Sequence, residues 1–216
     1  MTTPFTPVFL EGLLLGLGLF SAPGPKDTLV IHRGVSGHSV WGIVAICVVA
    51  DVILIALGIS GLAGVFAGYP LAISLLLLSG AIYLAWFGWQ RLRACVLNQS
   101  FAEMQAQGSL DRGALKEALL LSFANPYAWL DTIILIGPIG VAKPPSQQLS
   151  FASGAMAASL LWFVLLALGS TRASALFRSA RAWRLLDGAV ALLMAYLASG
   201  LMIELLHKHF PAGALW

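Results

Sequence analysis

The sequence predicts an all-α polytopic membrane protein with about six transmembrane helices. Of its 216 residues, 59% are hydrophobic and only 10% are charged, and the mean hydropathy of +0.90 is far above that of an ordinary globular domain. Long apolar runs recur along nearly the whole chain, each near or above the roughly 17–25 residues with which a helix spans a bilayer. Because these runs leave no room for a soluble domain, we expect residues 1–216 to form a single transmembrane domain.

The expected spans fall into two groups of three. The first group lies at about 7–31, 40–66 and 69–90, and the second at about 114–140, 148–170 and 183–206. A polar connection over about 91–113 separates repeat one (about 7–90) from repeat two (about 114–206). The first span follows a segment without Lys or Arg and has no evident cleavage site, so we interpret it as a retained helix and not as a secretory signal.

A helix-breaking proline interrupts the first span of each group. The residues that break the helices are Pro23, Gly24, Pro25 and Pro126. A proline inside a helix removes a backbone hydrogen bond and clashes with the preceding turn. An Asp-Thr pair follows each break, at Asp27 and at Asp131. Because a charge inside the bilayer costs about 2.5–3.5 kcal/mol on insertion scales, these segments are candidate functional sites.

The odd number of spans in each group predicts an inverted repeat, since the two groups then insert with opposite orientations. Interrupted helices at corresponding places in two such repeats are typical of a transporter whose binding site lies near the bilayer midplane. The alternative is that the prolines merely kink packed helices, which membranes tolerate. The paired breaks, each with an aspartate downstream, favour a transporter that works by alternating access.

Five polar residues are the candidate ligands for a substrate or a coupling ion: Lys26, Asp27, Asp51, Asn125 and Asp131. Asp51 lies in an apolar run, where burial disfavours the charged form, so it could bind a substrate amine or carry a coupled proton. Asp131 follows Asn125 by one to two turns and can face the same cavity, while Asn125 could bind a solute or cap the break. Lys26 and Asp27 either neutralise each other or complement the two charges of a zwitterion.

The basic residues indicate how the chain is oriented in the membrane. Those expected on one side are Arg33, Arg91, Arg93, Arg112, Lys116, Arg172, Arg178, Arg181 and Arg184. The opposite segments carry only Lys143 and Lys208, so the positive-inside rule places both termini outside the cytoplasm. The basic residues behind the net charge of +3 are thus explained by membrane orientation, and they indicate no nucleic-acid partner. We expect His32 in a loop and Asp187 near a span end, exposed to solvent.

Other classes of function have less support in the sequence. Cys47 and Cys95 form no Cys-x-x-Cys pair, and no His lies at metal-ligand spacing, so neither a metal nor another cofactor is expected. A redox relay would need cysteines beside the prolines, and no pattern for hydrolysis is present, so we do not expect an enzyme. A divalent-cation exporter is the alternative transporter, with carboxylate oxygens from Asp27, Asp51 and Asp131.

Several stretches together resemble a known family of exporters. They are Gly24-Pro25 with the polar pair and Thr28-Leu29-Val30-Ile31 after it, Asp51 in its apolar span, Gly80-Ala81-Ile82-Tyr83-Leu84-Ala85-Trp86-Phe87, Asn125-Pro126-Tyr127-Ala128-Trp129-Leu130-Asp131, and Ala157-Ala158-Ser159-Leu160-Leu161-Trp162-Phe163. On these residues the chain is similar to the LysE/ArgO-type family of lysine and arginine exporters, in the LysE/RhtB superfamily. The segment from Asn125 to Asp131 is the most specific part of the resemblance.

The resemblance implies secondary transport of a basic amino acid out through the bacterial inner membrane, driven by the proton gradient or the membrane potential. It also allows a homodimer. One difference concerns the substrate: basic amino-acid exporters usually read Gly-Pro-Gln-Asn where this chain reads Gly24-Pro25-Lys26-Asp27. A lysine beside the pocket would repel a cationic side chain unless Asp27 pairs with it.

Overall fold

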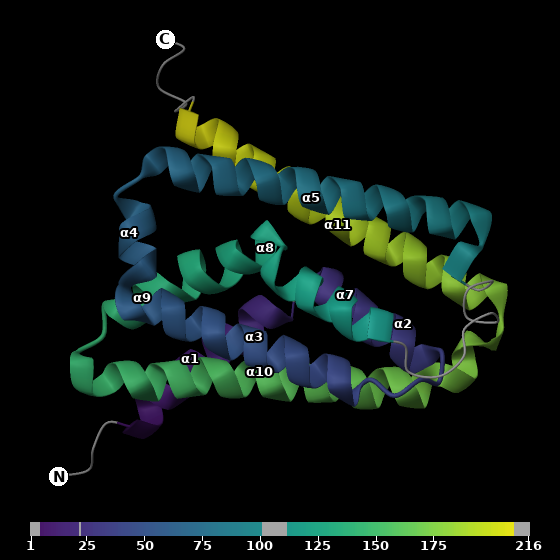
Figure 1. Cartoon of the computed structure of the whole chain (residues 1–216), viewed down its shortest axis with the longest axis horizontal. Helices are drawn as coiled ribbons and strands as arrows, with labels where there is room; N and C mark the ends of the chain where they lie inside the picture. Colours follow the sequence, from purple (N-terminus) through teal and green to yellow (C-terminus); the bar gives the residue numbers. More distant parts are fainter. Residues whose placement is uncertain (1–4, 22, 101–111, 210–216) are drawn as a thin grey trace.

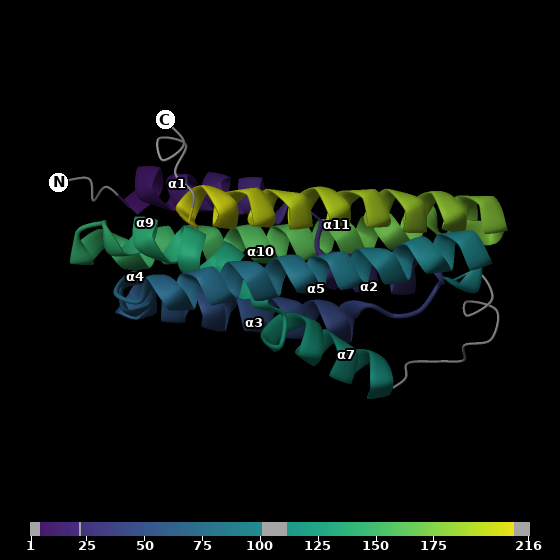
Figure 2. The same ribbon diagram turned by 90° about the horizontal axis from the view of Figure 1, so that it is seen from above.

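A computed structural model of the chain describes residues 5–21, 23–100 and 112–209. This part of the chain folds into an elongated bundle of helices and contains no strand (Figures 1 and 2). Four of its helices are long and apolar enough to cross a membrane, and six spans result when each of two bent helix pairs counts as one. The prediction of an all-α polytopic membrane protein with broken first and fourth spans is confirmed.

The first half of the chain begins with the broken span. Helices α1 (Phe5–Phe20) and α2 (Pro25–Val35) are bent by 74° relative to each other. Extended backbone at Gly24 precedes Pro25, whose fixed φ suits the first position of a helix. The helices that follow are α3 (Trp41–Leu57), the π-helical segment η1 (Gly58–Leu62), α4 (Ala63–Ala67) and α5 (Pro70–Leu97). A positive φ of 109° at Gly61 interrupts η1, a conformation that glycine adopts without steric cost.

The second half repeats the broken span and then two long helices. Helices α7 (Arg112–Phe123) and α8 (Pro126–Trp129) are followed by the π-helical segment η2 (Leu130–Ile136) and by α9 (Gly137–Val141). This span is bent by 50° at Asn125, where the chain is extended before Pro126. The long helices are α10 (Pro145–Ala173) and α11 (Ala180–His209), and the short 3-10 segment η3 (Ser174–Arg178) lies between them.

Corresponding spans of the two halves run in opposite directions (Figure 1). Helix α5 ends, and α7 and α11 begin, at the end of the bundle where α2 also ends, whereas α1 begins at the opposite end. We call the first of these the basic end, because the parts of α2, α5, α10 and α11 at that end carry Arg33, Arg91, Arg93, Arg172 and Arg184. The positive-inside prediction assigns the basic end to the cytoplasm.

The two halves pack crosswise. Helices α1 and α2 contact α10 of the second half, α7 and η2 contact α3 of the first half, and α5 lies against α11. The α1–α10 contact is close enough that a Cβ built on Gly12 would lie 2.1 Å from the Phe151 carbonyl oxygen, and one built on Gly154 would lie 2.1 Å from that of Phe9. Small residues let membrane helices approach closely in this way. Close packing matters because there is little hydrophobic driving force for helix association within lipid.

Candidate functional site

The two helix breaks form opposite walls of a small internal cavity, which we call the break cavity. Lys26 and Asp27 line it from α2, Asn125 and Asp131 line it from the second broken span, and Trp162 lines it from α10. The cavity measures about 30 Å³, room for a few water molecules. Of the five predicted ligands, four line this cavity and the fifth, Asp51, contacts Lys26 directly.

A buried ion pair joins Lys26 on α2 to Asp51 on α3. The Lys26 Nζ donates a hydrogen bond to Asp51 Oδ1, and the Asp51 side chain is fully buried. The second carboxylate oxygen, Oδ2, accepts a hydrogen bond of 2.7 Å from the Ser159 hydroxyl on α10. Lys26 Nζ also lies 5.6 Å from the centroid of the Phe163 ring. The pair therefore connects three helices, one of which belongs to the second half of the chain.

Asp27 caps the start of α2. Its Oδ2 accepts a hydrogen bond of 2.6 Å from the Gly24 N–H, and its Oδ1 accepts one of 2.8 Å from the Trp162 indole N–H. Both carboxylate oxygens thus bind N–H donors, which satisfies an otherwise orphaned backbone group at the helix N-terminus. The hypothesis that Lys26 and Asp27 neutralise each other is not what the structure shows, because Lys26 pairs with Asp51.

We expect Asp27→Ala to lower the free energy of unfolding by about 1–2 kcal/mol, because the capping hydrogen bond from the Gly24 N–H is lost. Thermal unfolding of the purified protein in detergent would measure the change. Glu204→Ala, which removes an exposed carboxylate near the end of α11, serves as the control and should leave the unfolding midpoint unchanged. Equal midpoints for both variants would contradict the capping role.

Asn125 and Asp131 organise the second break. Asn125 is buried, and its side-chain oxygen accepts a hydrogen bond of 3.0 Å from the Tyr127 N–H, so it caps α8. Asp131 lies in the π-helical segment η2 and interacts with the Tyr127 side chain. Such π-helical segments occur frequently at functional sites. Among the residues that the structure describes, Asp131 forms no ion pair within 4 Å, although Lys26 lines the same cavity.

Among the described residues, neither the thiols nor the carboxylates assemble into a metal site. Cys47 is buried and Cys95 is partly buried, and both are free. Within residues 5–21, 23–100 and 112–209, no three His, Cys, Asp or Glu side chains are grouped as metal ligands would be. The chemistry available at the break cavity is therefore that of one ion pair, the two further carboxylates of Asp27 and Asp131, and the ends of broken helices.

A second polar cluster lies at the basic end, and the sequence did not predict it. His32 is in the last turn of α2 and not in a loop, and Asp187 is buried on α11 and not exposed. Asp187 Oδ1 lies 3.2 Å from His32 Nε2 and 3.6 Å from a terminal nitrogen of Arg91 on α5. One signal was present in the sequence: Asp187 falls inside the predicted 183–206 span, where a carboxylate needs a partner.

The sequence is similar to known membrane translocators along most of its length. The family described as LysE type translocator matches residues 17–205. The lysine exporter LysE of Corynebacterium efficiens is 30% identical, over 91% of this chain and 98% of that protein. The putative amino-acid transporter YggA of Aeromonas salmonicida is 32% identical, over 88% and 92% of the two chains. The arginine exporter ArgO of Yersinia enterocolitica is 32% identical, over 74% of this chain and 79% of that protein. No solved structure matches the chain.

Proposed function

Because this chain belongs to the LysE type translocator family, we propose that it exports amino acids across the bacterial inner membrane, with the break cavity as the substrate site. Membership makes the protein a multi-pass membrane transporter and not an enzyme. The relatives named as lysine and arginine exporters support a basic amino acid as the substrate. The positive-inside distribution supports a cytoplasmic location for the basic end and an outside location for both termini.

One observation carries the proposal: Asp131 lines a cavity between two broken helices and forms no ion pair within 4 Å among the described residues. A carboxylate in that position can bind the ammonium group of an amino acid. The start of α2 faces the same cavity, and the positive end of its helix dipole can receive the substrate carboxylate. The two charges of an amino acid therefore have complementary groups on the two walls.

The Lys26–Asp51 pair bears on the choice of substrate. A free lysine in the cavity would repel a cationic side chain, but Asp51 compensates the charge of Lys26. The same contacts disfavour the divalent-cation alternative. Asp51 is committed to an ammonium group and Asp27 to two N–H donors, which leaves too few oxygens for a hard cation.

Transport by alternating access requires the break cavity to change size. At about 30 Å³ it cannot hold an amino acid, so α2 and η2 must separate before the substrate enters. The crosswise packing of the two halves supports an inverted repeat whose parts move against each other. Energy would come from the proton gradient or the membrane potential, and Asp51 is the residue we propose for a coupled proton because its pairing with Lys26 depends on its charge.

Counterflow in proteoliposomes tests this proposal. We expect vesicles loaded with unlabelled lysine or arginine to accumulate the labelled amino acid, and Asp131→Asn to reduce the initial rate at least tenfold because the ammonium ligand is lost. Glu204→Gln, at an exposed position on α11, should transport at the wild-type rate. An unchanged rate in Asp131→Asn would remove Asp131 from the site, and the absence of counterflow with all twenty amino acids would refute the function.

A further inference from the structure

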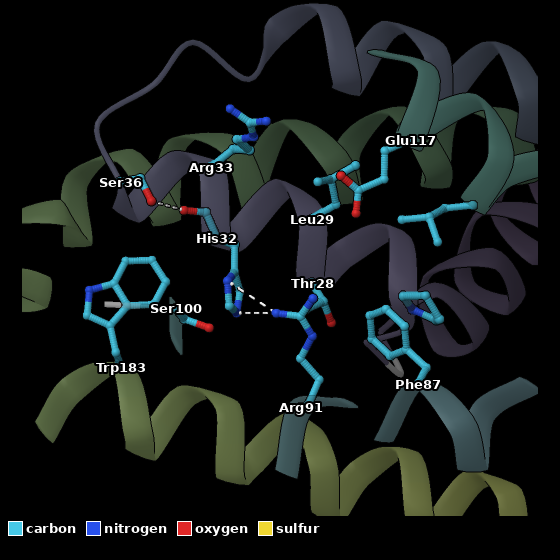
Figure 3. Close-up of a pocket in the computed structure, with 12 residues that line it drawn as sticks. Thr28, Leu29, His32, Arg33, Ser36, Phe87, Arg91, Ser100, Glu117 and Trp183 are labelled. Atoms are coloured by element: carbon cyan, nitrogen blue, oxygen red, sulfur yellow. Dashed lines mark hydrogen bonds between the residues drawn. The ribbon is translucent and has the colours of Figure 1, made fainter. Parts of the chain in front are cut away.

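A second and larger cavity opens at the basic end, and we call it the basic-end cavity (Figure 3). It measures about 90 Å³, three times the volume of the break cavity. His32 and Arg33 line it from α2, Arg91 from α5, Glu117 from α7 and Trp183 from α11. Pro25 lines both cavities, so the two are neighbours along α2. A solute that leaves the basic-end cavity along this helix reaches the break cavity next.

Arg91 is fixed so that its guanidinium group lies in this cavity (Figure 3). The group stacks 5.1 Å from the Phe87 ring centroid and lies 3.5 Å from the His32 ring nitrogens. Asp187 Oδ1, 3.6 Å from a terminal nitrogen of Arg91, is buried and compensates its charge. Arg91 Nε is buried and has no hydrogen-bond partner among the described residues. A guanidinium group that lines a cavity and is held in place by its neighbours is suited to bind a carboxylate.

Glu117 supplies the opposite charge from another wall. It lies on α7, is exposed, and lines the cavity together with Arg91 (Figure 3). In the part of the chain that the structure describes, Glu117 forms no ion pair within 4 Å, so its carboxylate is available to an ammonium group. A cavity with a cation on one wall and an anion on another complements a zwitterion better than it complements a simple anion or cation.

We infer that the basic-end cavity is a loading site for the exported amino acid, where Arg91 binds the α-carboxylate and Glu117 binds an ammonium group. The inference rests on the proposed function and adds a second binding position to it. From the loading site the amino acid passes Pro25 and enters the break cavity when α2 and η2 separate. Loading therefore precedes the conformational change and sets the affinity on the side of the basic end.

Everted membrane vesicles, in which the cytoplasmic face meets the medium, test the loading site with labelled L-lysine. We expect Arg91→Gln and Glu117→Gln each to raise the half-saturating lysine concentration at least tenfold, with the maximal rate within threefold of wild type. The matched controls are Arg93→Gln and Lys116→Gln, which remove charges from the same two helices at exposed positions that do not line the cavity. Both controls should saturate at the wild-type concentration.

Competition by lysinamide, which lacks the carboxylate, identifies the role of Arg91. Wild-type vesicles should prefer lysine to lysinamide at least tenfold, and Arg91→Gln should lose that preference while Glu117→Gln keeps it. Glu117→Gln leaves no buried charge unpaired, so it remains informative even if Arg91→Gln fails to fold. Wild-type half-saturation in Glu117→Gln, or an unchanged preference in a folded Arg91→Gln, would overturn the loading site. Failure of the proposed function would differ, because wild-type vesicles would then transport no amino acid at all.

Discussion

Replacing Lys26 with methionine is expected to abolish counterflow and to lower the free energy of unfolding by about 3–5 kcal/mol, the usual cost of breaking a buried ion pair. Asp51 is fully buried, and among the described residues the variant would leave its carboxylate with only the Ser159 hydroxyl as a hydrogen-bond donor. An uncompensated charge inside the bundle cannot be solvated. Thermal unfolding in detergent and counterflow in proteoliposomes would measure the two effects.

A double variant distinguishes the effect of an unpaired buried charge on stability from the effect of losing the ion pair on transport. Lys26→Met combined with Asp51→Leu replaces the pair by apolar side chains, which is often neutral for stability, so the unfolding midpoint should return close to wild type while transport stays absent. Lys143→Met is the control for loss of a cation near the surface. Its partner Glu11 has a side chain that is 47% exposed, so the cost should stay below about 1 kcal/mol. A wild-type midpoint in Lys26→Met alone would contradict the buried pair.

Replacing Gly154 with alanine is expected to disrupt the contact between α1 and α10. The added Cβ would lie 2.1 Å from the Phe9 carbonyl oxygen and 2.9 Å from the Leu13 nitrogen, which are both backbone atoms. Because backbone cannot rotate away as a side chain does, the two helices must move apart. Overpacking usually costs about 1–3 kcal/mol, and we expect a value at or above the upper end here. The thermal midpoint and the yield of monodisperse protein in detergent would report it.

Gly169 offers a matched control on the same helix. A Cβ at this position meets no atom within 4 Å, so Gly169→Ala changes only the helix propensity and should stabilise α10 by about 0.5–1 kcal/mol. The opposite signs expected for the two alanine substitutions distinguish packing from propensity. If Gly154→Ala were as stable as Gly169→Ala, the close approach of the helices would be wrong.

The sequence predicted the spans and their breaks because both depend on local physics. A bilayer requires an apolar run of a certain length, and a proline ends a helix at a known position. Helix ends were less predictable. The third span was expected to end at about residue 90, but α5 continues to Leu97, since polar residues such as Gln90 and Arg91 are good helix formers. It ends at Asn98, whose positive φ of 53° closes the helix.

The partners within the site were not predictable, because they come from different spans. Asp51 appeared isolated in sequence, yet Lys26 pairs with it from 25 residues earlier. The cluster of His32, Arg91 and Asp187 draws on three helices and was missed for the same reason. Which faces of helices meet depends on packing throughout the bundle, and no short pattern encodes it. The paired breaks, by contrast, lie at the cavity that four of the five candidate residues line.

The unequal lengths of the helices have a consequence for the surrounding lipid. Helices α5 and α11 contain 28 and 30 residues, which at 1.5 Å per residue gives lengths of about 42 and 45 Å. The hydrocarbon core of a bilayer is only about 30 Å thick, so these helices must tilt or extend into the head groups. Arg91 lies six residues before the end of α5, which is about 9 Å along the helix axis. Because a thicker bilayer takes more of each helix into the hydrocarbon, lipids with longer acyl chains should reduce the access of cytoplasmic water to the basic-end cavity.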